Sequence, residues 1–191
     1  MIGNIAAGLF GTGAPPAAPT SYESIATSIV GAGGTNTVTF SSIPSTYKHL
    51  QIRAILKNGR TSAGTSPMYF TFNGDSTSSY ASHLLYGSGS TAYAEAASTQ
   101  TRMFSAYAIG IASGYDNVFS GLVVDVLDYA VTTKNKTLRT LFGTSLNNEQ
   151  LDVGLGSGLY YKTDAISSIS ITSPSTPLQQ YSHFALYGIK D

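Results

Sequence analysis

From Tyr22 onward, hydrophobic residues recur at every second position of the chain. In His49–Lys57 every even-numbered residue is aliphatic and most odd-numbered ones are polar, and Met68–Phe72 repeats the alternation with larger apolar side chains. A period of two sends successive side chains to opposite faces of a β-strand. The pattern therefore predicts strands with one face in a core and the other towards solvent or a partner.

Similar runs predict further strands along the whole chain. Gly31–Gly34 lies between the first two of them and predicts a hairpin turn, and Asn73-Gly74 suits a turn with positive φ. The Ala-rich run Thr91–Gln100 is the longest helix-like possibility, but it lacks an apolar stripe. The other expected strands are Tyr22–Val30, Thr35–Ser41, Tyr80–Tyr86, Thr101–Ile111, Val118–Tyr129, Thr137–Thr144, Gly156–Tyr161, Ala165–Thr172 and Gln180–Ile189.

Nine or ten short strands separated by Gly, Ser and Pro predict an all-β fold. We expect one antiparallel β-sandwich domain over residues 21–191, jelly-roll-like, with an immunoglobulin-like sandwich as the alternative. The alternation predicts a core that includes Leu50, Ile52, Phe70, Phe72, Val124, Val126, Ile169, Ile171, Phe184 and Leu186.

The first 20 residues have a different composition. They are apolar and small, then rich in Gly and Pro, and they carry no charge, so the basic region of a signal peptide is missing. Glycines and prolines interrupt the apolar stretch that a membrane span would need. We expect an extended anchoring arm, and a frayed terminus is the alternative. Its anchoring side chains are Ile2, Ile5, Leu9 and Phe10, which are costly to leave in water.

The charge of the chain also restricts its function. Charged residues make up 10% of the sequence, against about 25% in ordinary soluble domains, and ten basic residues balance ten acidic ones. Nucleic-acid binding needs a basic excess, which is missing. The chain has no Cys, which excludes disulfides and Cys-based zinc sites. Low charge suits a fixed component of an assembly.

No spacing in the sequence matches a catalytic, phosphate-binding or zinc-binding motif. His49, His83 and His183 are isolated from one another, and Asp125 and Asp128 are three apart, which sends them to opposite faces of a strand. We expect Asp125 to be a paired polar residue and Asp128 to begin a turn, with Lys134 or Lys136 near enough to compensate the charge of Asp128. The segment 73–77 has oxygen ligands for Ca²⁺ but lacks the acidic alternation of a calcium loop, so a simple turn is favoured. We predict no catalytic residue, cofactor or metal.

Tyrosine is the one abundant residue type with an obvious use in recognition. Several tyrosines lie in or beside Gly- and Ser-rich segments, where their rings suit contacts with sugars or neighbouring subunits. The alternative is that most of them cap the ends of the sandwich as half-buried aromatics. The candidates are Tyr86, Tyr93, Tyr107, Tyr115, Tyr160 and Tyr161.

An ordered series of short motifs links the chain to a family. They are SYESIAT at Ser21–Thr27, a Gly-rich turn, F-x-SIP-x-TY-x-HL-x-I-R at Phe40–Arg53, NGD at Asn73–Asp75, DVLDYA at Asp125–Ala130 before Lys136 and Thr137, and F-x-LYGI at Phe184–Ile189. The series resembles a small β-sandwich domain that recurs in virion structural proteins of tailed bacteriophages of the marine cyanophage type. The resemblance covers residue 20 to the C-terminus and carries no catalytic residue.

What the resemblance implies is a place on the exterior of a virion, at the tail or the head. The chain is similar to tail-fibre-like and capsid-decoration-like proteins. The resemblance implies a homotrimer that contacts other virion proteins through the N-terminal arm. The expected function is a short tail-fibre or receptor-binding component, with a host surface glycan as a possible ligand. Capsid decoration is the alternative, and an enzyme such as a depolymerase is disfavoured by the motif search.

Overall fold

The computed structural model describes residues 20–61, 64–110, 117–145 and 152–190. Within these ranges the chain forms strands and no helix, so none of the described residues belongs to a helix that could cross a membrane. The strands are β1 (Tyr22–Ile29), β2 (Thr37–Phe40), β3 (His49–Asn58), β4 (Thr65–Phe72), β5 (Tyr80–Ser88), β6 (Thr91–Gln100), β7 (Met103–Gly110), β8 (Ser120–Leu127), β9 (Lys136–Gly143), β10 (Asp152–Tyr160), β11 (Ile169–Thr172) and β12 (His183–Ile189).

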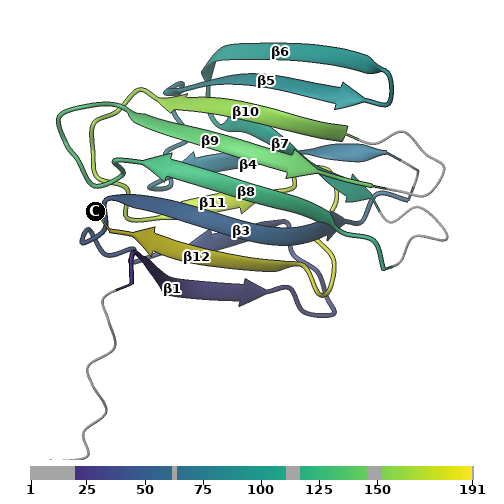
Figure 1. Cartoon of the computed structure of the whole chain (residues 1–191), viewed down its shortest axis with the longest axis horizontal. Helices are drawn as coiled ribbons and strands as arrows, with labels where there is room; N and C mark the ends of the chain where they lie inside the picture. The colour runs from purple at the N-terminus through teal and green to yellow at the C-terminus, as the bar shows by residue number, and fades with distance from the viewer. Residues whose placement is uncertain (1–19, 62–63, 111–116, 146–151, 191) are drawn as a thin grey trace, which may run out of the picture.

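The strands form two antiparallel sheets packed face to face (Figure 1). The large sheet has the order β6-β5-β10-β9-β8-β3-β12-β1, and the small sheet has the order β2-β11-β4-β7. The sheets join at one corner, where the end of β3 pairs in parallel with β7 through two residue pairs. The predicted antiparallel β-sandwich is therefore confirmed. The chain crosses repeatedly between the sheets, as it does in jelly-roll-like folds.

The core lies between the two sheets and follows the alternation of the sequence. All ten predicted core residues have no exposed surface. Each such large side chain contributes about 1.5–3 kcal/mol relative to exposure to water. The strands form where they do because every second side chain can be buried at once between the sheets.

One local expectation is wrong. Gly31–Gly34 does form a turn, closed by the Gly34 amide donating to the Gly31 carbonyl, but β1 pairs with β12 while β2 pairs with β11. The turn therefore carries the chain from one sheet to the other instead of closing a hairpin, because its two flanks bond to residues 178–182. The helix-like run Thr91–Gln100 is strand β6, because pairing with β5 supplies its hydrogen bonds.

The two outermost strands of the large sheet are β1 and β6 (Figure 1). Thr20, the first described residue, precedes β1, so the expected arm joins the sandwich at that edge. The expected anchoring side chains Ile2, Ile5, Leu9 and Phe10 lie outside the described residues, as does Tyr115. The opposite edge is the β5–β6 hairpin.

Candidate functional site

Three of the candidate tyrosines come together at the β5–β6 edge. Tyr86 of β5 stacks on Tyr93 of β6, with ring centroids 5.1 Å apart, because the two residues are directly paired across the hairpin. Tyr107 of β7 meets Tyr86 edge to face at 5.2 Å. Tyr93 is 45% exposed although its ring packs on Tyr86. This group, which we call the tyrosine cluster, presents aromatic surface to solvent at the edge of the large sheet opposite β1.

Glu95 of β6 fixes the tyrosine cluster through one carboxylate oxygen. The hydroxyls of Tyr86 and Tyr107 both donate to Oε1, at 2.9 and 3.0 Å. Burial, together with the hydrogen bonds to Tyr86 and Glu95, raises the pKa of Tyr107 well above its usual range, and burial and Glu95 also raise that of Tyr86. The rings therefore stay protonated and fixed in orientation, which suits a preformed binding surface.

The aromatic surface continues from the tyrosine cluster onto the small sheet. Phe104 packs on Tyr107 at 5.1 Å and on Tyr69 at 5.7 Å, and the guanidinium of Arg102 lies 3.8 Å above the Tyr69 ring. A continuous line of rings thus runs from β6 across β7 to β4. Tyrosines with polar tips and apolar bodies suit contacts with sugar rings or with another protein surface.

The other candidate tyrosines lie elsewhere. Tyr160 is a core residue, 1% exposed, and its ring stacks on Tyr80 at 4.9 Å, so it does not face a ligand in the single chain. It is buried because the inward positions of β10 are even-numbered. Tyr161, the next residue, is exposed but follows the Tyr80 end of the β5–β10 pair, whereas Tyr86 lies near the other end of β5.

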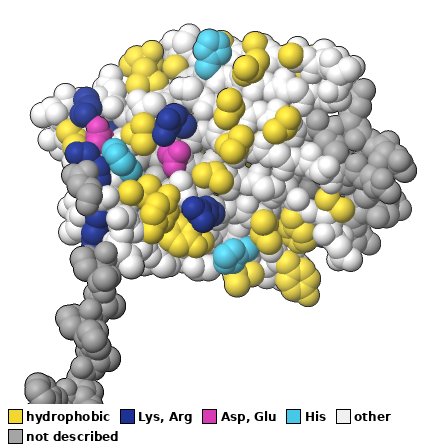
Figure 2. Space-filling view, viewed as in Figure 1, with side chains coloured by type: hydrophobic (Ala, Val, Ile, Leu, Met, Phe, Trp, Pro, Cys, Tyr) yellow, Lys and Arg dark blue, Asp and Glu magenta, His cyan; other side chains and the backbone are white. Residues whose placement is uncertain are grey.

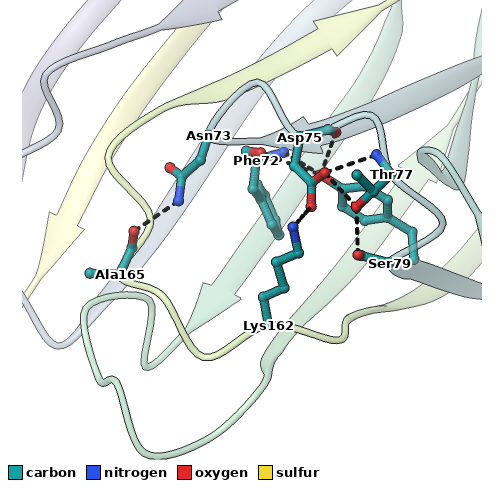
Figure 3. Close-up of polar contacts among 8 residues, drawn as sticks. Phe72, Asn73, Asp75, Thr77, Ser79, Lys162 and Ala165 are labelled. Carbon is teal, nitrogen blue, oxygen red and sulfur yellow. Dashed lines mark hydrogen bonds and ion pairs between the residues drawn. The ribbon is translucent and has the colours of Figure 1, made fainter.

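The FNGD segment forms a polar turn whose carboxylate is paired within the protein. Asn73 and Gly74 have φ values of 53° and 65°, as the sequence predicts. Figure 3 shows the Asp75 carboxylate accepting hydrogen bonds from Thr77 and pairing with Lys162, whose Nζ lies 2.8 Å from Oδ2. Burial alone would raise the pKa of Asp75, but the bonds from Lys162 and Thr77 outweigh it and hold that pKa well below its ordinary value. The Asp75 carboxylate therefore links the turn between β4 and β5 to the segment that follows β10.

The remaining polar candidates also have structural partners. Asp125 accepts a hydrogen bond from Gln51 at 2.8 Å and lies 3.6 Å from Arg139, and Asp128 has φ 48° and lies 2.5 Å from Lys134. Both expectations are confirmed. Lys136 instead is buried and donates to backbone carbonyls, including those of Lys134 and Thr163 at 2.9 and 2.8 Å, and burial lowers its pKa.

The three histidines do not form a site. All three occupy outward positions of the large sheet, but they belong to different strands and different registers. Over the four described ranges, no group of three His, Asp or Glu side chains lies close enough to hold a metal ion.

The outward face of the large sheet is unusually apolar, and we call it the outer face. Figure 2 shows hydrophobic side chains scattered over it, while the Lys, Arg, Asp and Glu side chains gather on the left half of the view. It carries six of the most exposed aliphatic side chains, namely Ile29, Ile55, Leu85, Leu141, Val153 and Leu155. Between them lies a shallow hollow of about 620 Å³ over Gly121 and Gly143. The signal for this face in the sequence is the presence of aliphatic residues at outward positions of β9 and β10, such as Leu141 and Leu155, and sequence reasoning missed it.

Comparison with protein-family models, with curated proteins and with solved structures finds no match to this chain.

Proposed function

We propose that this chain is a non-enzymatic structural protein on the exterior of a tailed-phage virion, a short tail-fibre or receptor-binding component. The motif series from Ser21 to Ile189 supports the virion assignment. A domain of this kind acts by binding, through an arm that holds it to the particle and a distant surface that meets the host.

The observation that carries the receptor-binding part is the position of the tyrosine cluster. Tyr86 and Tyr93 lie on β5 and β6 and Tyr107 packs on them from β7, while the expected arm leads into β1, at the opposite edge of the eight-stranded large sheet. Seven strand intervals separate the two edges, a distance of about 34 Å. A fibre head needs this polarity, with a free aromatic end far from the anchor.

The ligand class that fits the tyrosine cluster is a host surface glycan. Tyr93 offers an exposed ring, and Glu95 supplies a carboxylate that can accept hydrogen bonds from sugar hydroxyls. Tyr86 and Tyr107 hold both groups in place, so little conformational entropy is lost on binding.

Replacing Tyr93 by Ala tests this binding surface. We expect the purified wild-type chain to bind host cells and their extracted surface polysaccharide, and Tyr93→Ala to bind about tenfold more weakly or worse, a loss of about 1.4 kcal/mol. Tyr181→Asn is the control, because Tyr181 is 67% exposed elsewhere and its φ of 70° suits Asn. Equal binding by wild type and Tyr93→Ala, or an equal loss in Tyr181→Asn, would refute the proposal.

Capsid decoration is the second candidate. The outer face favours it, because a decoration protein buries a broad base on the head lattice and this face is both broad and apolar. The two candidates differ in their location on the particle.

A further inference from the structure

The outer face carries glycines that the single chain does not need. A Cβ added at Gly121 would meet no atom within 4 Å, and at Gly143 and Gly87 it would meet single atoms only at 3.9 Å. None of the three has a positive φ. Glycine in a strand costs stability and often marks a place where another backbone approaches closely.

These glycines lie in one row across the sheet. Through the register of the strands, Gly121 of β8 is paired with Gly143 of β9, and Val153 of β10 is paired with both Gly143 and Gly87 of β5. We call this the glycine row. Gly121, Gly143 and Val153 of this row line the hollow, and Ile55 of β3, which is paired with Gly121, lines its end.

A row of large aliphatic side chains runs beside it, two residues away on the same strands. Its members are Val123, Leu141, Leu155 and Leu85, each paired with the next in the register. We call this the aliphatic row. Leu141, Leu155 and Leu85 are all more than half exposed. On β8, β9 and β5 a glycine and an aliphatic residue therefore alternate on the outward face.

We propose that the outer face packs against the same face of a second copy of this chain. The two copies are related by a two-fold axis that lies in the plane of the interface, runs across the strands and passes between the two rows. This axis places the aliphatic row of each copy over the glycine row of the other. Val123, Leu141 and Leu85 then enter the spaces over Gly121, Gly143 and Gly87 of the second copy. On β10, Val153 meets Leu155. Facing sheets pack about 10 Å apart, at which distance such side chains interdigitate.

The charges of the outer face fit this arrangement. Asp125 and Arg139 lie in the next row and pair with each other, so the two-fold axis places them at the rim of the interface, where water reaches them. Neither the glycine row nor the aliphatic row contains a carboxylate. Arg53, at the end of the aliphatic row, lies near the rings of Tyr22 and Tyr187, at 5.5 and 5.9 Å.

The size of the face also suits a stable pair. Eight strands span about 34 Å and strands of this length about 26 Å, so the face covers roughly 900 Å². A standard protein interface buries about 800 Å² per partner. The pair has two-fold symmetry, unlike the trimer that the family resemblance implies, and it does not depend on the proposed function.

Filling the glycine row tests the pair. We expect sedimentation equilibrium of the full chain at micromolar concentration to give the mass of a dimer, and the double variant Gly121→Val, Gly143→Val to give a monomer that keeps the far-UV circular dichroism spectrum of the wild type and still unfolds cooperatively, at a lower temperature because the dimer no longer stabilises it. An added Cβ meets no atom within 4 Å at Gly121 and only Val153, at 3.9 Å, at Gly143, and Val favours strands, so the variant should keep its fold. Ser157→Val, an exposed position on the same face in the row of Asp125 and Arg139, is the control and should stay dimeric.

Leu141→Lys is the second variant, because it puts a charge into the interface without touching a glycine, and it should also give a monomer. A monomeric or trimeric wild type, or dimeric forms of both the double variant and Leu141→Lys, would overturn the proposal.

The full chain with Ile5→Asp and Leu9→Asp should stay dimeric. If that change abolishes the dimer, the arm occupies the outer face instead and the face-to-face pair is wrong.

Discussion

At the scale of residues, a few polar side chains join segments that are far apart in the sequence. Asn73 donates to the Ala165 carbonyl at 2.9 Å and accepts from the amides of Ser167 and Ser168, and the adjacent Asp75 pairs with Lys162. The NGD turn thus fixes the connection between β10 and β11. Sequence reasoning predicted the turn from Asn73-Gly74 but could not find its distant partners, because nothing local specifies them.

Replacing Asp75 by Asn should destabilise the domain. The substitution keeps the shape of the side chain but removes the charge that Lys162 faces, and hydrogen bonds to charged groups contribute about 1.5–3 kcal/mol each. We expect a loss of about 2 kcal/mol in the free energy of unfolding, measured by urea denaturation at pH 7. Asp164→Asn, an exposed position in the neighbouring segment, is the control and should change little.

The same carboxylate makes stability depend on pH. Because the pKa of Asp75 is lower in the folded chain than its ordinary value of 3.8, its contribution is complete above about pH 4 and disappears as the pH falls towards the folded pKa. The difference in stability between wild type and Asp75→Asn should therefore shrink below pH 4. A difference that stays constant down to pH 2.5 would show that the contribution of Asp75 is not electrostatic.

At the scale of elements, β10 explains how closely the two sheets approach. Its inward positions Gly156 and Gly158 leave room for β7, and a Cβ on Gly156 would lie 2.5 Å from the Ser105 carbonyl oxygen and 2.4 Å from Thr140 Oγ1. That space lets the Thr140 hydroxyl donate to the Ser105 carbonyl across the sandwich. These glycines differ from those of the outer face, because the single chain itself requires them.

Gly156→Ala should therefore destabilise the fold. Overpacking of this kind costs about 1–3 kcal/mol, and thermal unfolding should show it as a lower melting temperature. Gly31→Ala is the matched control, since no atom lies within 4 Å of its added Cβ and its φ is not positive. If Gly156→Ala and Gly31→Ala have the same melting temperature, the close approach of β7 does not depend on Gly156.

The elements show what the sequence could predict and what it could not. Alternation in β3, β4, β8, β11 and β12 was sufficient to place the core, since burial of one face is read directly from a period of two. The pairing of β1 with β12 was not predictable, because the turn at Gly31–Gly34 has the same local signal whether it closes a hairpin or crosses between sheets. Tyr160 was misplaced because flanking residues do not reveal which face of β10 is buried.

At the scale of the whole molecule, the two edges and one face of the large sheet have different roles in our account. The expected arm leads into β1, the tyrosine cluster lies at the opposite edge, where β7 packs against β5 and β6, and the outer face between the two edges carries exposed aliphatic side chains. The resemblance predicted a binding protein, and the positions of these surfaces relative to one another became visible only in the fold. They arise from pairings across the whole chain.

Immunogold electron microscopy tests the central claim of a virion exterior protein most directly. Antibodies raised against residues 20–190 should label tailed particles at a projecting tail structure, and mass spectrometry of the same purified particles should find the chain. Label spread over the head would support capsid decoration in place of a receptor-binding role. Particles that neither bind the antibody nor contain the chain would contradict the account.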